Sequence, residues 1–93
     1  MTKVSELLAH FEVEDGLWQA FTAEAGSPGE DLRLLATLPR PVVAASLTQA
    51  SLDDNAHLTA IQAAQVGLVW KLARRLMYVR GGGRWDDWVE EDP

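Results

Sequence analysis

The side chains best suited to bind a charged ligand form a basic block late in the sequence. Residues 71–84 contain no acidic residue, and their basic residues are Lys71, Arg74, Arg75, Arg80 and Arg84. Lysines and arginines gathered on a helix can neutralise the phosphates of a nucleic acid. The whole chain, however, carries a net charge of −6, whereas nucleic-acid-binding domains are commonly basic over an entire face. Phosphate contact by the basic block is therefore the alternative functional hypothesis and not the first.

An aromatic and acidic segment follows the basic block. Trp85 and Trp88 lie three residues apart in a stretch that contains acidic residues and no basic one. Large aromatic side chains are common anchors of protein–protein interfaces, so one hypothesis is that this segment docks into a groove of a partner. The other is that it folds back across Gly81–Gly83 and packs on its own domain, against Trp70 or Met77. The sequence leaves both hypotheses open.

A set of residues for catalysis is missing. A nucleophilic side chain needs an adjacent base and a third group that orients the base. The only histidines, His10 and His57, have no such companions in the sequence, and there is no Gly-x-Ser-x-Gly turn. We therefore predict that the protein is not an enzyme.

Metal ions and cofactors have no convincing site either. The chain has no cysteine, which excludes disulfides and cysteine-ligated zinc or iron–sulfur sites. Two groups of residues are candidate metal ligands. The first is Asp53, Asp54 and His57, and the second is Asp86, Asp87 and Glu90. Neither group has the spacing of a calcium-binding loop. Phosphate-binding loops precede a helix, because the N-terminal end of the helix dipole is positive. Gly81–Gly83 follow a predicted helix instead, so they do not indicate a phosphate-binding loop. We predict no metal, no cofactor and no small-molecule substrate.

Helices are expected to position all of these residues. The chain has 93 residues, 47% of them hydrophobic, with many alanines and leucines, which favours one all-α domain. Apolar spacing and start signals predict helices over residues 3–11, 15–25, 28–38 and 41–51, and a long last helix from 55 or 60 to 79. The expected fold is a compact bundle of four to five helices at residues 1–80. A glycine hinge and a short aromatic-acidic tail follow at residues 81–93.

Two of the predicted helix starts involve proline. Ser27-Pro28-Gly29-Glu30 has the order of a capping box with proline at the first helical position. Pro41 is expected to open the next helix in the same way, with Val42 turned inward. Because the residue before a proline avoids helical geometry, Leu38 and Arg40 are expected to be extended and to form a tight corner.

The last helix has apolar residues on two sides. One stripe consists of Ile61, Leu68, Leu72, Leu76 and Val79, and the other of Val66, Trp70, Ala73 and Met77. A helix that is apolar on two sides contacts a partner in addition to its own core, or lies at the centre of a bundle. We assign the second stripe and the tail to the partner, so that the predicted contact residues are Val66, Trp70, Met77, Trp85 and Trp88.

These observations predict a non-enzymatic helical protein–protein interaction module that acts in a larger protein or assembly. Self-association is one form that such binding takes, and nucleic-acid binding through the basic block is the alternative. No stretch approaches the ~20 apolar residues that span a membrane, and the first residues lack the order of a signal peptide. We therefore expect a soluble intracellular protein, with cytoplasm and nucleus not distinguished.

Overall fold

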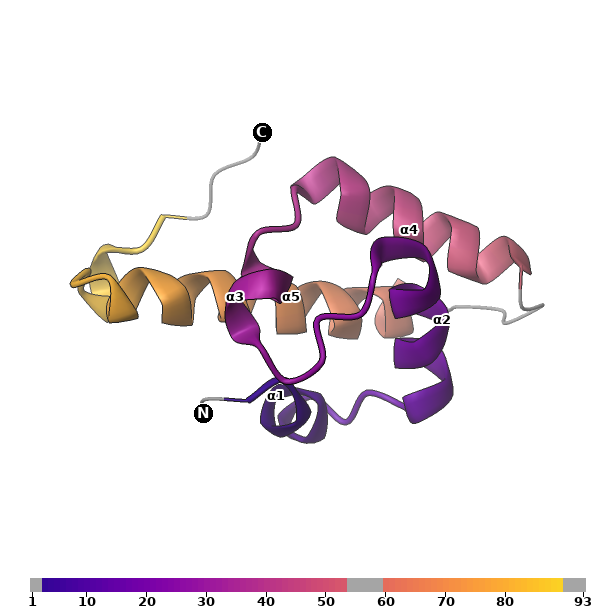
Figure 1. Cartoon of the computed structure of the whole chain (residues 1–93), viewed down its shortest axis with the longest axis horizontal. Coiled ribbons are helices and arrows are strands. Elements are labelled where there is room, and N and C mark those ends of the chain that lie inside the picture. Colours follow the sequence, from indigo (N-terminus) through magenta and orange to yellow (C-terminus); the bar gives the residue numbers. More distant parts are fainter. Residues whose placement is uncertain (1–2, 54–59, 90–93) are drawn as a thin grey trace.

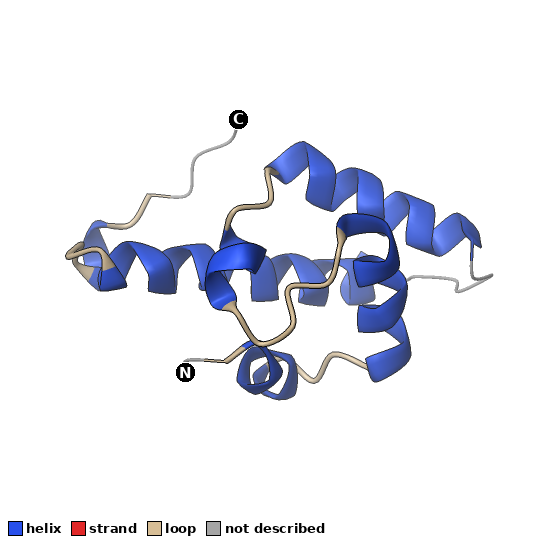
Figure 2. Cartoon of the chain, viewed as in Figure 1, coloured by secondary structure: helices blue, strands red, loops and turns tan. Residues whose placement is uncertain are grey.

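The chain forms a bundle of α-helices, as predicted (Figure 1). A computed structural model describes residues 3–53 and 60–89. Its helices are α1 (Val4–His10), α2 (Asp15–Ala25), α3 (Leu32–Ala36), α4 (Arg40–Asp53) and α5 (Ala60–Arg80), followed by the short 3₁₀ helix η1 (Trp85–Asp87). Within these described residues the elements are helices joined by loops, without a strand (Figure 2). None of the described helices is both long and apolar enough to cross a membrane.

Helix α5 is the longest element, and the others pack around part of it. The molecule measures 42 × 26 × 21 Å. Helix α3 packs across α5, α2 packs against α4, and α1 lies beside α5 (Figure 1). One apolar core joins them, and its buried residues are Val4, Leu7, Val13, Leu17, Phe21, Leu32, Leu35, Val43, Val66, Val69, Trp70 and Ala73. The last turns of α5 extend beyond α3 to one end of the molecule (Figure 1).

Helices α1 and α2 are separate, and the predicted bounds of α2 agree with those in the structure. The break between them is a tight turn at Glu12, whose φ of 55° is not helical. The backbone N–H of Val13 donates to the carbonyl of Leu8 at 2.9 Å, and the Val13 side chain is buried in the core. This turn ends α1 and sends α2 in a new direction.

The predicted capping box at residues 27–30 is wrong. Gly29 has a φ of 59°, which interrupts any helix through that segment. Helix α3 begins at Leu32 instead, and Asp31 caps it by accepting a hydrogen bond from the backbone N–H of Arg33 at 2.9 Å. The Ser27 hydroxyl accepts a local bond from the Gly29 N–H. Aspartate is as good an N-cap as serine, and here it lies closer to the buried leucines.

The chain passes from α3 to α4 within three residues, but the predicted extended geometry of Arg40 is wrong, because α4 starts one residue earlier than expected. Arg40 belongs to the helix because the N–H groups of Val42 and Val43 both donate to the carbonyl of Pro39. Val42, which was expected to turn inward, is 39% exposed, and Val43 is the buried one. The indole N–H of Trp70 donates to the carbonyl of Leu38 at 2.8 Å and so ties the corner to α5.

The glycines after α5 reverse the direction of the chain. The N–H of Gly82 donates to the carbonyl of Val79, and the N–H of Gly83 to that of Tyr78, each at 3.0 Å. Gly82 adopts a φ of 101°, which residues other than glycine rarely adopt. The segment after Gly83 therefore runs back along α5 instead of continuing away from it (Figure 1).

Candidate protein-interaction surface

The structure buries two of the α5 residues that the sequence-based prediction assigned to a partner. Val66 is fully buried and Trp70 is only 2% exposed, so neither is available to a partner of the folded domain. They point into the core because α3 and the α3–α4 corner pack on that side of α5. Met77 from the same stripe is half-buried and lines a hollow with Tyr78 and Trp88. The expected assignment of Val66 and Trp70 to a partner surface is therefore corrected.

The other apolar stripe of α5 forms a partly exposed outer face. We define this outer face as Ile61, Leu68, Leu72, Leu76 and Val79. Ile61 is 73% exposed, Leu68 44% and Val79 37%. At 3.6 residues per turn, Leu68 lies about 160° round the helix from the buried Trp70. Leu72 and Leu76 are half-buried and pack against the core, so the exposed part of the outer face consists of Ile61, Leu68 and Val79.

A groove runs beside this outer face, and we call it the α1–α5 groove. It has a volume of 430 Å³ and is lined by Phe11, Leu68, Lys71, Leu72, Arg75 and Trp88. Four of these residues are apolar and two are basic. Phe11 comes from the end of α1 and Trp88 from the tail, so the groove exists only in the folded chain. A partner that fits it must offer apolar groups together with negative charge.

The tail folds back and packs on α5, where Trp88 lines a hollow together with Met77 and Tyr78. The rings of Trp88 and Tyr78 lie 5.2 Å apart, and Trp88 is half-buried. The Trp85 ring lies 3.8 Å from the guanidinium carbon of Arg75, whose Nε also donates to the Trp85 carbonyl at 3.0 Å. Trp85 remains 42% exposed. Of the two tryptophans, Trp88 helps to build the groove and Trp85 lies at the surface.

The basic block does not form a single row. The guanidinium of Arg74 lies against Trp70 and Trp88, on the side of α5 that faces α3. Arg75 points to the other side, where it contacts Trp85 and lines the α1–α5 groove with Lys71. Arg84 is 3.9 Å from the carboxylate of Asp87. Arg80 contacts the sulfur of Met77 at 4.0 Å. Their charges therefore face several directions, unlike a continuous phosphate-binding surface.

One ion pair perturbs the titration of its members. Hydrogen bonds from the side chain and the backbone N–H of Arg33 lower the pKa of the Asp31 carboxyl, and the Arg33 pKa is raised in return. Both residues lie at the start of α3, away from the α1–α5 groove. Their interaction is a helix cap with a charge partner and suggests no chemistry.

Metal ligands do not gather in the described part of the chain. No cluster of three or more histidine, cysteine, aspartate or glutamate side chains occurs there. The candidate groups from the sequence fall partly outside the described residues, because Asp54, His57 and Glu90 are not among them.

The residues that sequence reasoning missed are mainly Phe11, Leu68 and Leu72. The last two belong to the stripe that the sequence-based prediction did not assign to a partner, and Phe11 joins them only because α1 packs beside α5. Comparison of the chain with known protein families, curated proteins and solved structures finds no match.

Proposed function

We propose that this protein is a helical interaction module that binds a partner protein through the outer face of α5 and the adjoining α1–α5 groove. The observation that carries the proposal is the exposed apolar row itself, in which Ile61 and Leu68 are 73% and 44% exposed. Apolar side chains clustered on a surface and bordered by charge commonly mark interaction sites. The groove beside Leu68 adds a concave surface into which a partner side chain can insert.

The spacing of the row matches the recognition of another helix. Leu68, Leu72 and Leu76 follow one another at intervals of four residues, so they stand one turn apart along α5. An amphipathic helix places its own apolar residues at the same intervals and buries them in such a groove. Lys71 and Arg75 line the groove. The partner that fits is therefore a helical segment with one apolar face and acidic residues beside it.

A second copy of this chain is the weaker occupant. In a two-fold symmetric interface the same patch meets itself. Lys71 and Arg75 would then face the equivalent positive charges of the other copy, which is unfavourable. A different protein with an acidic margin avoids this repulsion and gains charge complementarity instead.

A peptide titration tests the proposal directly. The probe is a synthetic helical peptide with leucines at i, i+4 and i+7 and glutamates flanking them, followed by fluorescence anisotropy. The double variant Leu68→Gln with Leu72→Gln is expected to weaken binding by at least about tenfold, because each buried leucine contributes roughly 1.5–3 kcal/mol. Leu34→Gln is the matched control, since Leu34 is 54% exposed on α3 and does not line the groove.

The remaining outcomes separate the competing functions. Equal binding of a scrambled peptide that lacks the apolar stripe, or full binding by the double variant, would contradict the proposal. A dimer in light scattering that the double variant abolishes would identify a second copy as the partner. A DNA duplex that binds with a steep salt dependence, lost on Lys71→Gln, would favour the nucleic-acid alternative.

A further inference from the structure

Helix α5 has three basic residues close to the α1–α5 groove. They are Lys71, Arg74 and Arg75. Residues 60–84 contain no acidic residue, so none of the three has a carboxylate one turn away on its own helix. Each is therefore a candidate to meet the acidic margin of a bound partner, and the surroundings of the three side chains distinguish them.

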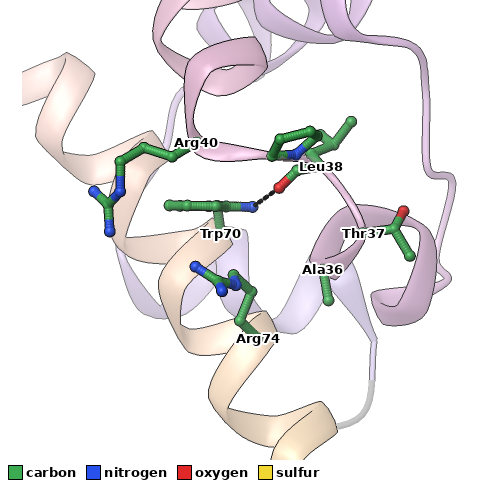
Figure 3. Close-up of a pocket in the computed structure, with 7 residues that line it drawn as sticks. Ala36, Thr37, Leu38, Arg40, Trp70 and Arg74 are labelled. Atoms are coloured by element: carbon green, nitrogen blue, oxygen red, sulfur yellow. Dashed lines mark hydrogen bonds between the residues drawn. The ribbon is translucent and has the colours of Figure 1, made fainter. Parts of the chain in front are cut away.

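Arg74 belongs to another side of α5. Its guanidinium carbon lies 4.9 Å from the centre of the Trp70 ring, where the helix meets the α3–α4 corner (Figure 3). Trp70 is 2% exposed and its N–H donates to the carbonyl of Leu38 at 2.8 Å, so the ring on which Arg74 rests is held in place. The residues that line the α1–α5 groove do not include Arg74. A partner bound in the groove therefore meets other charges.

Arg75 lines the groove, but its guanidinium is bound to the tail. The Nε of Arg75 donates to the carbonyl of Trp85 at 3.0 Å, and one Nη donates to the same oxygen. The Trp85 ring lies 3.8 Å from the guanidinium carbon. A guanidinium pairs most strongly with a carboxylate through two neighbouring N–H groups in its plane. In Arg75 the edge with Nε is already bonded to Trp85, so a partner carboxylate would have to compete for it.

Lys71 lines the same groove without a comparable contact. Among residues 3–53 and 60–89, no hydrogen bond or ion pair joins the Lys71 ammonium to another group. Its side chain is half-buried and lines the groove together with Leu68 and Leu72. A partly buried charge is screened less by water and salt than an exposed one, so a carboxylate brought to it gains more. An ammonium also accepts a carboxylate from several directions, because its three donors rotate.

We propose that Lys71 is the residue by which the α1–α5 groove selects an acidic partner helix, whereas Arg75 stays bound to the tail. This selection rests on the proposed function and specifies which charge the partner must meet. Residues of a helix advance by about 1.5 Å each, so Lys71 lies at a level between Leu68 and Leu72 along α5. The partner carboxylate therefore belongs beside the apolar residue that packs on these two leucines, and not one turn further along, at Arg75.

Two matched peptides test the role of Lys71 in the whole chain of 93 residues. One is the glutamate-flanked helical peptide, and the other is its twin with glutamines in place of the glutamates; fluorescence anisotropy measures the affinity of each. The native chain is expected to bind the glutamate peptide about three- to fivefold more tightly, as one ion pair at a surface allows. Lys71→Gln is expected to abolish this preference and to leave the affinity for the glutamine peptide unchanged. Lys71→Arg keeps the charge and is expected to keep the preference.

Two further variants separate Lys71 from the other positive charges. Arg75→Gln removes the contacts with Trp85, so it is expected to weaken the binding of both peptides by the same factor and to leave the preference for glutamate intact. Arg84→Gln removes the same charge from an exposed site outside the groove, and is expected to change neither affinity.

The possible failures are distinguishable. Equal affinity of the native chain for the two peptides, or a preference that Arg75→Gln abolishes and Lys71→Gln does not, would overturn the role of Lys71 and leave apolar recognition by the groove standing. If neither peptide binds, the proposed function fails and the role of Lys71 fails with it. In NMR spectra of the complex, nuclear Overhauser contacts between the Arg75 Nε–H and the Trp85 ring are expected to persist. Their loss on addition of the glutamate peptide would show that Arg75 leaves the tail for the partner, which also overturns the proposal.

Discussion

The rings of Tyr78 and Trp88 pack against each other with their centres 5.2 Å apart, and this contact holds the tail against α5. Tyr78 lies near the end of α5, whereas Trp88 follows the 3₁₀ helix. The three glycines between them let the chain reverse within a few residues. One wall of the α1–α5 groove therefore depends on a turn that lies outside the groove itself.

We predict that Gly83→Ala loosens the tail. A Cβ atom at position 83 would collide with the ring of Tyr78, so that ring must shift, and we expect the shift to disturb its packing against Trp88. Faster amide hydrogen exchange over residues 85–89, measured by mass spectrometry, is the expected result. Gly81→Ala is the matched control, because its Cβ would meet only backbone oxygens at 3.5 Å or more. Equal exchange in the two variants would show that the Tyr78 contact does not hold the tail.

The tryptophans of the core and the tail should differ sharply in their effect on stability. Trp70→Ala removes a large buried side chain and leaves the Leu38 carbonyl without its indole donor, so we expect a loss of about 3–5 kcal/mol in the free energy of unfolding. Trp85→Ala removes a side chain that is 42% exposed, and we expect a loss of about 1 kcal/mol or less. Urea unfolding followed by circular dichroism measures both.

Two neighbouring residues of α5 distinguish its inner side from its outer face. Val69 is fully buried, and Val69→Ala is expected to lower the free energy of unfolding by about 1.5–3 kcal/mol. Leu68 is 44% exposed, and Leu68→Ala is expected to cost under about 1 kcal/mol while weakening peptide binding. The opposite order of stabilities in thermal or urea unfolding would mean that α5 turns its Leu68 side, and not its Val69 side, to the core.

The cap of α3 should make stability depend on pH in the acid range. The pKa of Asp31 is lower in the folded chain than its ordinary value of 3.8, because Arg33 stabilises the carboxylate. The unfolded chain therefore takes up the proton first as the pH falls. The stabilisation is complete above the ordinary pKa and declines as the pH falls below it towards the folded pKa.

The measurement is a series of melting temperatures across that range. Asp31→Asn keeps an N-capping side chain but cannot titrate, so its melting temperature should fall less steeply with acid than that of the native chain. Arg33→Gln removes the main cause of the lowered pKa and should reduce the same slope. A slope that neither variant changes would place the acid sensitivity elsewhere in the chain.

Much of the helical architecture follows from local physics. Apolar residues spaced at 3.6 residues predict α2 with its observed bounds, and the glycines after Arg80 predict the end of α5 to within a residue. Local signals misled where two of them competed. Ser27 and Asp31 are both acceptable caps, and the structure uses Asp31 because Gly29 is not helical. Sequence order alone does not rank such alternatives.

The direction in which α5 faces was decided by the tertiary structure. Its two stripes, one with Leu68 and one with Trp70, are both apolar enough to form a core, and helical periodicity contains no information about which of them meets α3. Packing of α3 and the hydrogen bond from Trp70 to Leu38 bury the side of α5 with Val66 and Trp70 and leave Leu68 on the other side exposed. The same packing brings Arg40 to Arg74 from distant parts of the chain. The sequence by itself determined the all-α class and most of the helical segments with their apolar residues, whereas contacts between helices decided which apolar residues remain exposed.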